Sequence, residues 1–194
     1  MDSETAEEIL DATGRALCER GYAELTIKDI AAESSLSTAA IHYHFDTKEE
    51  LLNAFLDHLI EDFEGRLAAD PDGPSERLSA FLEAVFTPAE EGSGAFAVAL
   101  MELKSQAPYQ ETYRDRFRRM DGRMREEIET TVSEGTASGV FAETDPGTVA
   151  RFVVTAINGG HVREVALGEG PGETRAVVED FLEARLGWTP EGDA

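Results

Sequence analysis

The apolar residues of this sequence recur every three to four positions in each long segment, and no stretch alternates in the pattern of a β-strand. Residues 47–68 show this helical period most clearly, as one continuous apolar stripe made of Leu51, Leu52, Phe55, Leu56, Leu59, Ile60, Phe63 and Leu67. A shorter stripe ends near Gly21 and consists of Ile9, Leu10, Thr13, Ala16 and Leu17. The periodicity predicts an all-α fold.

Capping residues set the bounds of the predicted helices. Thr26 with Asp29 and Thr47 with Glu50 each fit a capping box, and Ser37 suits the N-cap of a short helix. About nine helices follow: a first that ends near Gly21, and others at 26–33, 38–45, 47–68, 75–88, 93–106, 108–138, 146–168 and 173–186.

Proline and glycine mark the breaks in the later part of the chain. Asp145 followed by Pro146 suits an N-cap and a first helical turn, and Gly139 and Gly187 suit positions just past helix ends. The segment DPDGPS at 70–75 is rich in turn-forming residues and predicts a linker.

The two short helices at 26–33 and 38–45, joined by a turn of about four residues, have the proportions of a helix-turn-helix motif. The second helix of this motif lies in the major groove of DNA and needs small residues at its start. Ser37, Thr38, Ala39 and Ala40 meet that need. The proportions alone also fit a helical hairpin that belongs to a bundle.

The residues in this region carry a more specific signal. The stretch IAAESSLSTAAIHYHFDTKEEL, with GYAELTIKDIA just before it, resembles the N-terminal domain of the TetR (tetracycline-repressor) family of transcriptional regulators. The similarity covers about 45 residues. The matching elements are Gly21-Tyr22, Thr26, Ile30-Ala31, Leu36-Ser37, His44-Phe45, and Thr47-Lys48-Glu49 with Leu51.

The resemblance implies a set of DNA contacts, in which Lys48 reaches a phosphate from the start of its helix and Phe45 belongs to the core. The implied contact residues are Thr26, Lys28, Ser37, Thr38, Ala39, Ala40, His42, Tyr43, His44 and Lys48.

Three positions depart from the family pattern. Ser35 replaces the glycine of the turn, Ala39 replaces a frequent glycine, and His42 replaces a tyrosine that touches a phosphate. These departures put the turn geometry and one phosphate contact in question.

The resemblance also implies two domains. Residues 1–46 are expected to form the helix-turn-helix DNA-binding domain, and residues 47–194 the ligand-binding and dimerisation domain. The helix at 47–68 connects the two.

The charge balance changes the expected mode of DNA binding. The chain has 40 acidic residues, 17 lysines and arginines, and a net charge of −23. Only three of the bases are lysine, which resembles proteins from halophilic organisms, where molar salt screens self-repulsion. An ordinary acidic protein, or one that binds cations or basic partners, is the alternative.

The acidic N-terminus does not fit a signal peptide and no apolar run could span a membrane, so we expect a cytoplasmic protein.

The body is expected to bind a small-molecule effector and to form a homodimer, as the resemblance implies. The candidate pocket residues are Phe63, Phe86, Phe96, Met101, Tyr113, Phe117, Met120, Asn158 and His161. Plain core packing is the alternative for the apolar ones, and an interface hydrogen bond for Asn158 and His161. The candidate dimer-interface residues, on the last two helices, are Phe152, Ala156, Gly159, Gly160, Arg163, Val178, Phe181 and Leu182.

Six arginines gather in RDRFRRMDGRMR at 114–125, which suggests a second nucleic-acid patch. They flank an apolar stripe on both sides, so we predict that they pair with acidic residues of the same chain.

An enzyme is not expected. The sequence lacks glycine motifs for phosphates, Ser138 is misplaced for a nucleophile elbow, and the four histidines are scattered. We therefore assign no catalytic residue, metal or cofactor. An acidic protein that binds partners without DNA is the second rival. The sequence predicts a homodimeric repressor that an effector releases from a palindromic operator in double-stranded DNA.

Overall fold

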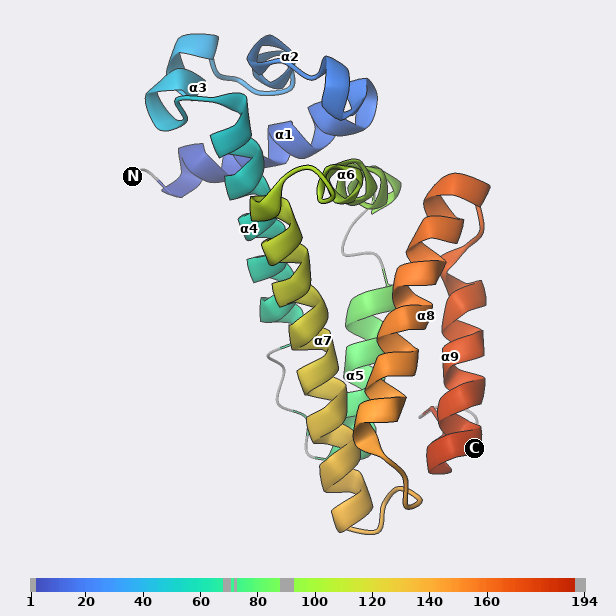
Figure 1. Ribbon diagram of the computed structural model, residues 1–194. Helices are drawn as coiled ribbons and strands as arrows, with labels where there is room; N and C mark the ends of the chain where they lie inside the picture. The colour runs from blue at the N-terminus through green and yellow to red at the C-terminus, as the bar shows by residue number, and fades with distance from the viewer. Residues whose placement is uncertain (1–2, 68–70, 72, 88–92, 191–194) are drawn as a thin grey trace. The chain divides into compact units, whose positions relative to one another are not determined.

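The computed structural model describes residues 3–67, 71, 73–87 and 93–190, which form nine α-helices and no strand (Figure 1). This confirms the predicted all-α fold, and the last eight helices begin and end within three residues of the predicted bounds. The helices are α1 (Ser3–Glu24), α2 (Ile27–Ala32), α3 (Thr38–His44), α4 (Lys48–Leu67), α5 (Pro74–Phe86), α6 (Ser93–Gln106), α7 (Glu111–Ala137), α8 (Pro146–Leu167) and α9 (Pro171–Leu186).

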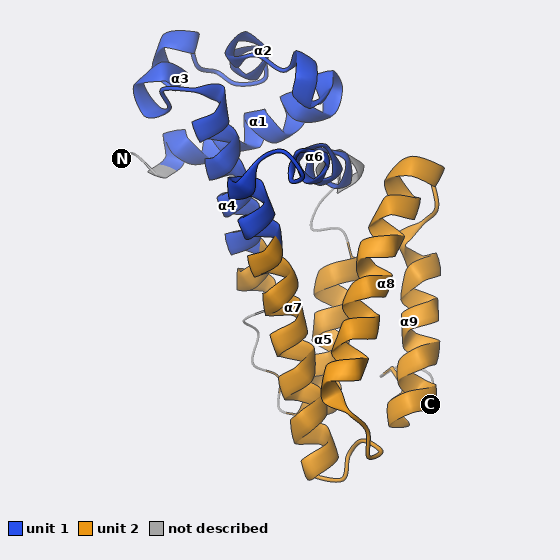
Figure 2. Cartoon of the chain, viewed as in Figure 1, with its two compact units in different colours: residues 1–62, 92–117 blue, residues 63–91, 118–194 orange. Residues whose placement is uncertain are grey.

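The chain divides into two compact units (Figure 2). Unit 1 comprises residues 1–62 and 92–117, and unit 2 comprises residues 63–91 and 118–194. Packing therefore joins α6 and the first turns of α7 to the N-terminal head, although the expected functional boundary lies at residue 46.

The predicted end of the first helix near Gly21 appears as a break inside α1. Gly21 has φ 71° and ψ 163°, so the helical path stops there and a last short turn continues to Glu24. Only glycine adopts this positive φ at low cost. Gly139 and Gly187, predicted just past helix ends, also have positive φ.

The capping predictions hold with one change. Thr26 and Asp29 form a complete capping box, and the Ser37 side chain accepts the Ala40 N–H. Thr47 Oγ1 accepts the Glu50 N–H at 3.1 Å, but the Glu50 carboxylate accepts the N–H of Asp46 instead of that of Thr47. Asp145 caps α8, as the sequence predicts.

The core of unit 1 lies between α1, α2, α3, α4 and α6. The predicted stripe of α4 is buried from Leu51 to Ile60 in this unit and continues with Phe63 in unit 2, while the side chain of Leu67 lies outside the described residues. Phe45 is only 8% exposed, in agreement with its expected core role. Burial of these side chains fixes the short helices of the head against α4.

The core of unit 2 brings together the end of α4 and helices α5, α7, α8 and α9. Its largest members include Phe63, Phe81, Met124, Phe141 and Trp188. The Trp188 indole N–H donates to the carbonyl of Ser75 at 3.3 Å. In the described part of the chain, no helix is long and apolar enough to cross a membrane.

Candidate nucleic-acid interface

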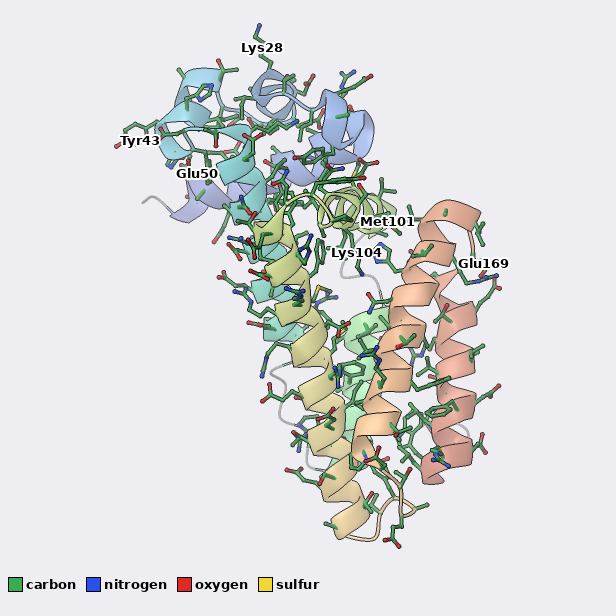
Figure 3. The ribbon with its side chains drawn as sticks, in the orientation of Figure 1. Lys28, Tyr43, Glu50, Met101, Lys104 and Glu169 are labelled. Carbon is green, nitrogen blue, oxygen red and sulfur yellow. The ribbon has the colours of Figure 1, made fainter. Side chains whose placement is uncertain are left out.

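The predicted reading helix α3 is held by one buried residue and presents the others outward. Ile41 is fully buried, whereas Ala39, His42 and Tyr43 are exposed. The Tyr43 side chain is 87% exposed and projects away from α3 (Figure 3). The exposed face of α3 is therefore the candidate surface for base contacts.

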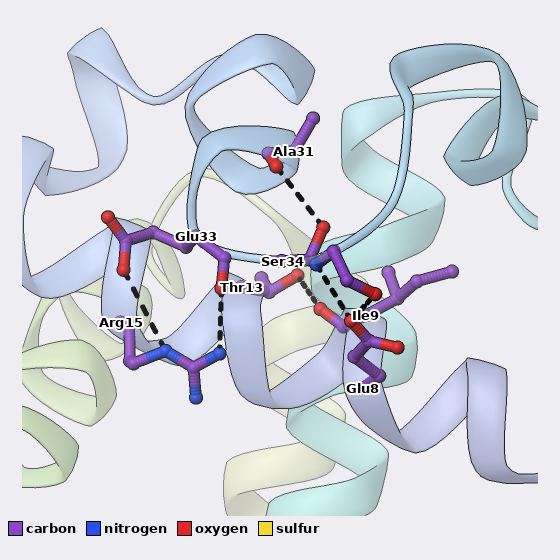
Figure 4. A network of polar contacts seen from close by, with 8 residues as sticks. Glu8, Ile9, Thr13, Arg15, Ala31, Glu33 and Ser34 are labelled. Carbon is purple, nitrogen blue, oxygen red and sulfur yellow. Dashed lines mark hydrogen bonds and ion pairs between the residues drawn. The ribbon is translucent and has the colours of Figure 1, made fainter.

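The turn before α3 keeps ordinary backbone geometry without the glycine of the family pattern. No described residue other than glycine has a positive φ, so Ser35 is unstrained. Its N–H and Oγ both donate to Glu8 Oε1, at 2.8 and 2.7 Å. These two bonds hold the pKa of the Glu8 carboxyl below its usual value. Figure 4 shows this network, in which the Ser34 Oγ also donates to the carbonyl of Ala31.

The arginines of the head serve its own packing. Arg15 Nη2 donates to the carbonyl of Glu33 at 2.8 Å, and Arg20 Nε lies 3.7 Å from Asp29. These contacts join α1 to α2 and to Glu33, the residue that follows α2. The two arginines thus orient the helix-turn-helix motif against the first helix, and each forms an ion pair with an acidic residue.

The two lysines of the predicted DNA face differ in their surroundings. Lys28 is exposed on α2 and extends away from the head (Figure 3). Lys48 Nζ instead donates to the carbonyls of Tyr22 at 2.8 Å and Leu25 at 2.9 Å. An ammonium has three donors, so Lys48 uses two of them inside unit 1. Its phosphate contact stays a prediction, and Lys28 is the basic side chain that reaches outward from the motif.

The candidate pocket residues fall into both units. Phe63 lies in the core of unit 2, and Phe86 and Met120 pack against it. The side chain of Phe96 lies outside the described residues. Three others belong to unit 1, namely the half-buried Met101, the fully buried Tyr113, and Phe117, whose ring lies 5.6 Å from Lys104 Nζ.

Asn158 has a partner that sequence reasoning missed. Its Nδ2 donates to Asp121 Oδ1 at 3.2 Å and to the carbonyl of Val154 at 2.9 Å. Asp121 lies on α7, 37 positions earlier, so no local spacing could reveal the pair. His161 is half-buried one turn further along α8. Unit 2 thus contains a carboxylate hydrogen-bonded to an amide, and an imidazole one turn further along α8.

The structure buries two of the predicted interface residues and packs a third against a neighbouring helix of the same chain. Val178 and Leu182 are fully buried in the core of their own unit, so they have no surface for a partner. A Cβ at Gly160 would lie 2.4 Å from Thr174 Oγ1, so this glycine serves the packing of α8 on α9 within one chain. Helical period shows that a face is apolar but not which neighbour covers it.

Other apolar side chains of α8 and α9 face outward. Phe152 is 38% exposed and its ring stacks on that of Phe181 at 3.7 Å. Val162 and Val177 are 48% and 57% exposed, and both lie outside the set predicted from the sequence. Gly159 has open space around its Cβ position. This exposed face combines the predicted residues Phe152, Phe181 and Gly159 with Val162 and Val177, and it fits a subunit interface.

Three of the six arginines in 114–125 pair with acidic residues of the chain, as predicted. Arg116 binds both oxygens of Asp57, at 2.9 and 2.6 Å, and Arg123 lies 3.9 Å from Glu64. Arg125 lies 3.6 Å from Glu129. Arg114 instead donates to backbone carbonyls of the turn between α6 and α7. These contacts weaken the case for a second nucleic-acid patch.

Comparison with known proteins agrees with this geometry. Residues 9–55 match the family model of bacterial regulatory proteins of the tetR family. Residues 74–187 match that of the C-terminal part of BetI-type transcriptional repressors. The HTH-type transcriptional regulator BetI of Brucella suis biovar 1 (strain 1330) is 23% identical over 201 residues, which cover 100% of this chain and 97% of the relative.

Two solved structures extend the likeness. A TetR transcription regulator from Haloarcula marismortui ATCC 43049 is 40% identical with a TM-score of 0.87, over 95% of this chain and 99% of that one. A transcriptional regulator from Saccharomonospora viridis, in complex with choline, is 25% identical with a TM-score of 0.84, over 95% and 98% of the two chains.

Proposed function

The chain belongs to the TetR family of DNA-binding transcriptional regulators, with a C-terminal part of the BetI type, and we propose that a small cation of the choline class is its effector. Regulators of this family bind operator DNA as dimers and respond to effector ligands. In the proposed cycle the free dimer occupies a palindromic operator, and the bound cation favours a conformation that no longer fits the operator.

The arrangement of α2, the turn and α3 is the observation that supports operator binding by this chain. Ile41 is buried and anchors α3, whereas the side chains of His42 and Tyr43 on the same helix are exposed to solvent, as is Lys28 on α2. Side chains in these positions can reach base edges and phosphates when α3 enters the major groove. We propose the ten residues expected from the sequence as contacts, with Lys28 as the main cationic contact and Lys48 as a secondary one.

The class of effector follows from the chemistry of a quaternary ammonium. Such a cation cannot donate a hydrogen bond from its nitrogen, so proteins bind it with aromatic faces and carboxylates. The choline complex of the Saccharomonospora viridis protein supports this class for the present chain. Choline also presents an apolar surface of methyl groups around its charge.

Unit 2 holds groups of the required kinds. Asp121 supplies a carboxylate that accepts a hydrogen bond from Asn158 Nδ2, and Phe86 and Met120 supply aromatic and polarisable surface in the same unit. His161 follows Asn158 by about one helical turn. We propose these five residues as the effector site, with Asp121 as the charge that selects a cation.

A titration of the complex with operator DNA tests the proposal. Fluorescence anisotropy would follow a labelled duplex from the region upstream of the protein's own gene, in molar KCl. Choline should release the protein, whereas 3,3-dimethylbutan-1-ol, which has the same shape without the charge, should not. Equal release by the neutral compound would point to an apolar effector and refute the cation.

A substitution that removes the charge but keeps the shape of the side chain locates the site. Asp121→Asn keeps the shape but removes the charge, and should raise the choline concentration needed for half-release by about tenfold, which corresponds to about 1.4 kcal/mol. Glu143→Gln, at an exposed position of the loop after α7, is the matched control and should leave it unchanged. An unaltered response of Asp121→Asn would place the effector elsewhere.

We further propose that the protein acts in the cytoplasm, where operator DNA is found, and at high salt. The second part rests on the excess of 40 acidic residues over 17 lysines and arginines. Growth-condition data for the source cell would test it.

A further inference from the structure

Tyr22 stands at the end of the helical path of α1 and is held by three other elements of unit 1. The preceding residue, Gly21, turns the backbone out of the helix with φ 71°. This turn exposes the N–H and the carbonyl of Tyr22, which would otherwise have partners within a helix. Both groups find partners far away in the sequence, and so does the hydroxyl.

The first partner is on α6, which packs along α1. The N–H of Tyr22 donates to Glu102 Oε2 at 2.9 Å, across 80 positions of sequence. The same carboxylate lies beside Gly21, because a Cβ built there would be 3.6 Å from Oε2. A charged acceptor makes this hydrogen bond stronger than a neutral one. Any shift of Glu102 along α1 would therefore act on the backbone of Tyr22.

The second partner is on α4, the helix that runs from the head into unit 2. Lys48, its first residue, donates from Nζ to the carbonyl of Tyr22 at 2.8 Å. The same Nζ lies 4.9 Å from the centroid of the Tyr22 ring, within the range of a cation–π contact. Lys48 thus joins the beginning of α4 to both the backbone and the ring of Tyr22.

The third partner is the start of α7. Gln110 Nε2 donates to the hydroxyl of Tyr22 at 2.6 Å, across 88 positions. The rings of Tyr22 and Tyr113 meet edge to face, with centroids 6.4 Å apart and an interplanar angle of 88°. Burial, with Tyr22 beside it, raises the pKa of the Tyr113 hydroxyl, so Tyr113 stays neutral.

We propose that Tyr22 is the positioning residue that links α6 and α7 to the reading head, through a Tyr22 junction made of Tyr22, Lys48, Glu102, Gln110 and Tyr113. The proposal rests on the effector response described above, because it says how α6 and α7 would transmit that response. The helix-turn-helix motif begins at Thr26, four residues after Tyr22, and Lys48 also holds the carbonyl of Leu25. A displacement of α6 or α7 therefore reaches α2 through four residues of backbone.

Coupling between two sites is reciprocal, so it can be measured from the DNA side without any effector. If the junction transmits, operator binding at the head must alter the stability of the segment from Glu102 to Tyr113. Hydrogen exchange of full-length protein, with and without an operator duplex from the upstream region of its own gene, reports that stability.

Single substitutions remove one contact each. Tyr22→Phe and Gln110→Leu both delete the bond between the Tyr22 hydroxyl and Gln110, from opposite sides, and Gln110→Leu keeps the test valid if Tyr22→Phe does not fold. Tyr109→Phe is the matched control, because that hydroxyl is on an 85% exposed side chain of the same turn. Each junction variant should reduce the operator-dependent change in exchange by about 2- to 30-fold.

The outcomes separate the two proposals. The junction is supported if operator changes the hydrogen exchange of residues 102–113 in the wild type and in Tyr109→Phe. That change must also be reduced equally in both single variants and in their double mutant. An unchanged response in Tyr22→Phe and Gln110→Leu, or no response in the wild type, overturns it. Failure of choline to release operator, with the exchange response intact, would refute the effector class and leave the junction supported.

Discussion

The carboxylate of Glu8 on α1 accepts two hydrogen bonds from Ser35, one from its N–H and one from its hydroxyl. The pair spans 27 positions and fixes the turn of the helix-turn-helix motif to the first helix. Ser35 stands where the family pattern has a glycine, and it keeps a negative φ. A serine in this position therefore replaces the freedom of the glycine backbone with a side-chain contact.

Replacing Glu8 should lower thermal stability in a pH-dependent way. Its pKa is lowered in the folded state by the two bonds from Ser35, so the ionised form stabilises the fold. This contribution is complete above the usual carboxyl pKa of 4.5 and is lost as the pH falls through the lowered value. Glu8→Gln should thus have a lower Tm than the wild type at pH 7, with a gap that shrinks below pH 4.5. Asp11→Asn, exposed on the same helix, should show no such gap.

The two lysines of the head should respond differently to removal. Lys28→Ala should weaken binding to all DNA sequences alike, reduce the salt slope by about one, and leave Tm unchanged. Lys48→Ala should also lower the free energy of unfolding, by about 1–3 kcal/mol, because two backbone carbonyls lose a charged donor. Anisotropy and thermal melts would measure both. Equal stability of the two variants would contradict the internal role of Lys48.

The reading helix should carry the sequence preference. Tyr43→Ala and Thr38→Ala should weaken operator binding, because each would remove a contact to base edges. Both should also lower the ratio of the affinity for operator to the affinity for random-sequence DNA. A ratio unchanged in both variants, with only the overall affinity lower, would assign these side chains to the phosphate backbone. Lys28→Ala serves as the comparison, since its effect should be the same on both duplexes.

Salt should affect operator binding less than it does for basic DNA readers. The head up to residue 46 has ten acidic residues and three lysines and arginines, and two of the three, Arg15 and Arg20, contact acidic residues or carbonyls of the head itself. Little counterion release can follow from such a surface. The slope of log affinity against log KCl should therefore be shallow. A loss of about 10³–10⁵ in affinity between 50 and 200 mM salt would contradict this.

Local signals in the sequence were sufficient for the helices and their ends, because caps and apolar period act within a few residues. Long-range partners were not predictable in this way. Nothing near Tyr22 indicates Glu102, and nothing near Asn158 indicates Asp121. The helical period of the apolar residues also led to the wrong choice between two neighbouring interface candidates on α9, since Val178 is buried within the chain and Val177 is exposed. Both belong to one apolar stretch, and only the packing of α9 against α8 and α5 distinguishes them.

The exposed apolar face of α8 and α9 should be the site where two subunits meet. Val177 is 57% exposed, so Val177→Asp would place a charge on a surface that dimerisation removes from water, and two copies of it across a two-fold axis. The expected result is a monomer in size-exclusion chromatography with multi-angle light scattering, with helical content kept in circular dichroism. Operator affinity should fall steeply, because one head reads only a half-site. Val140→Asp is the matched control, since Val140 is 52% exposed in the segment after α7. A dimer that persists in Val177→Asp and dissociates in Val140→Asp would move the interface away from α8 and α9.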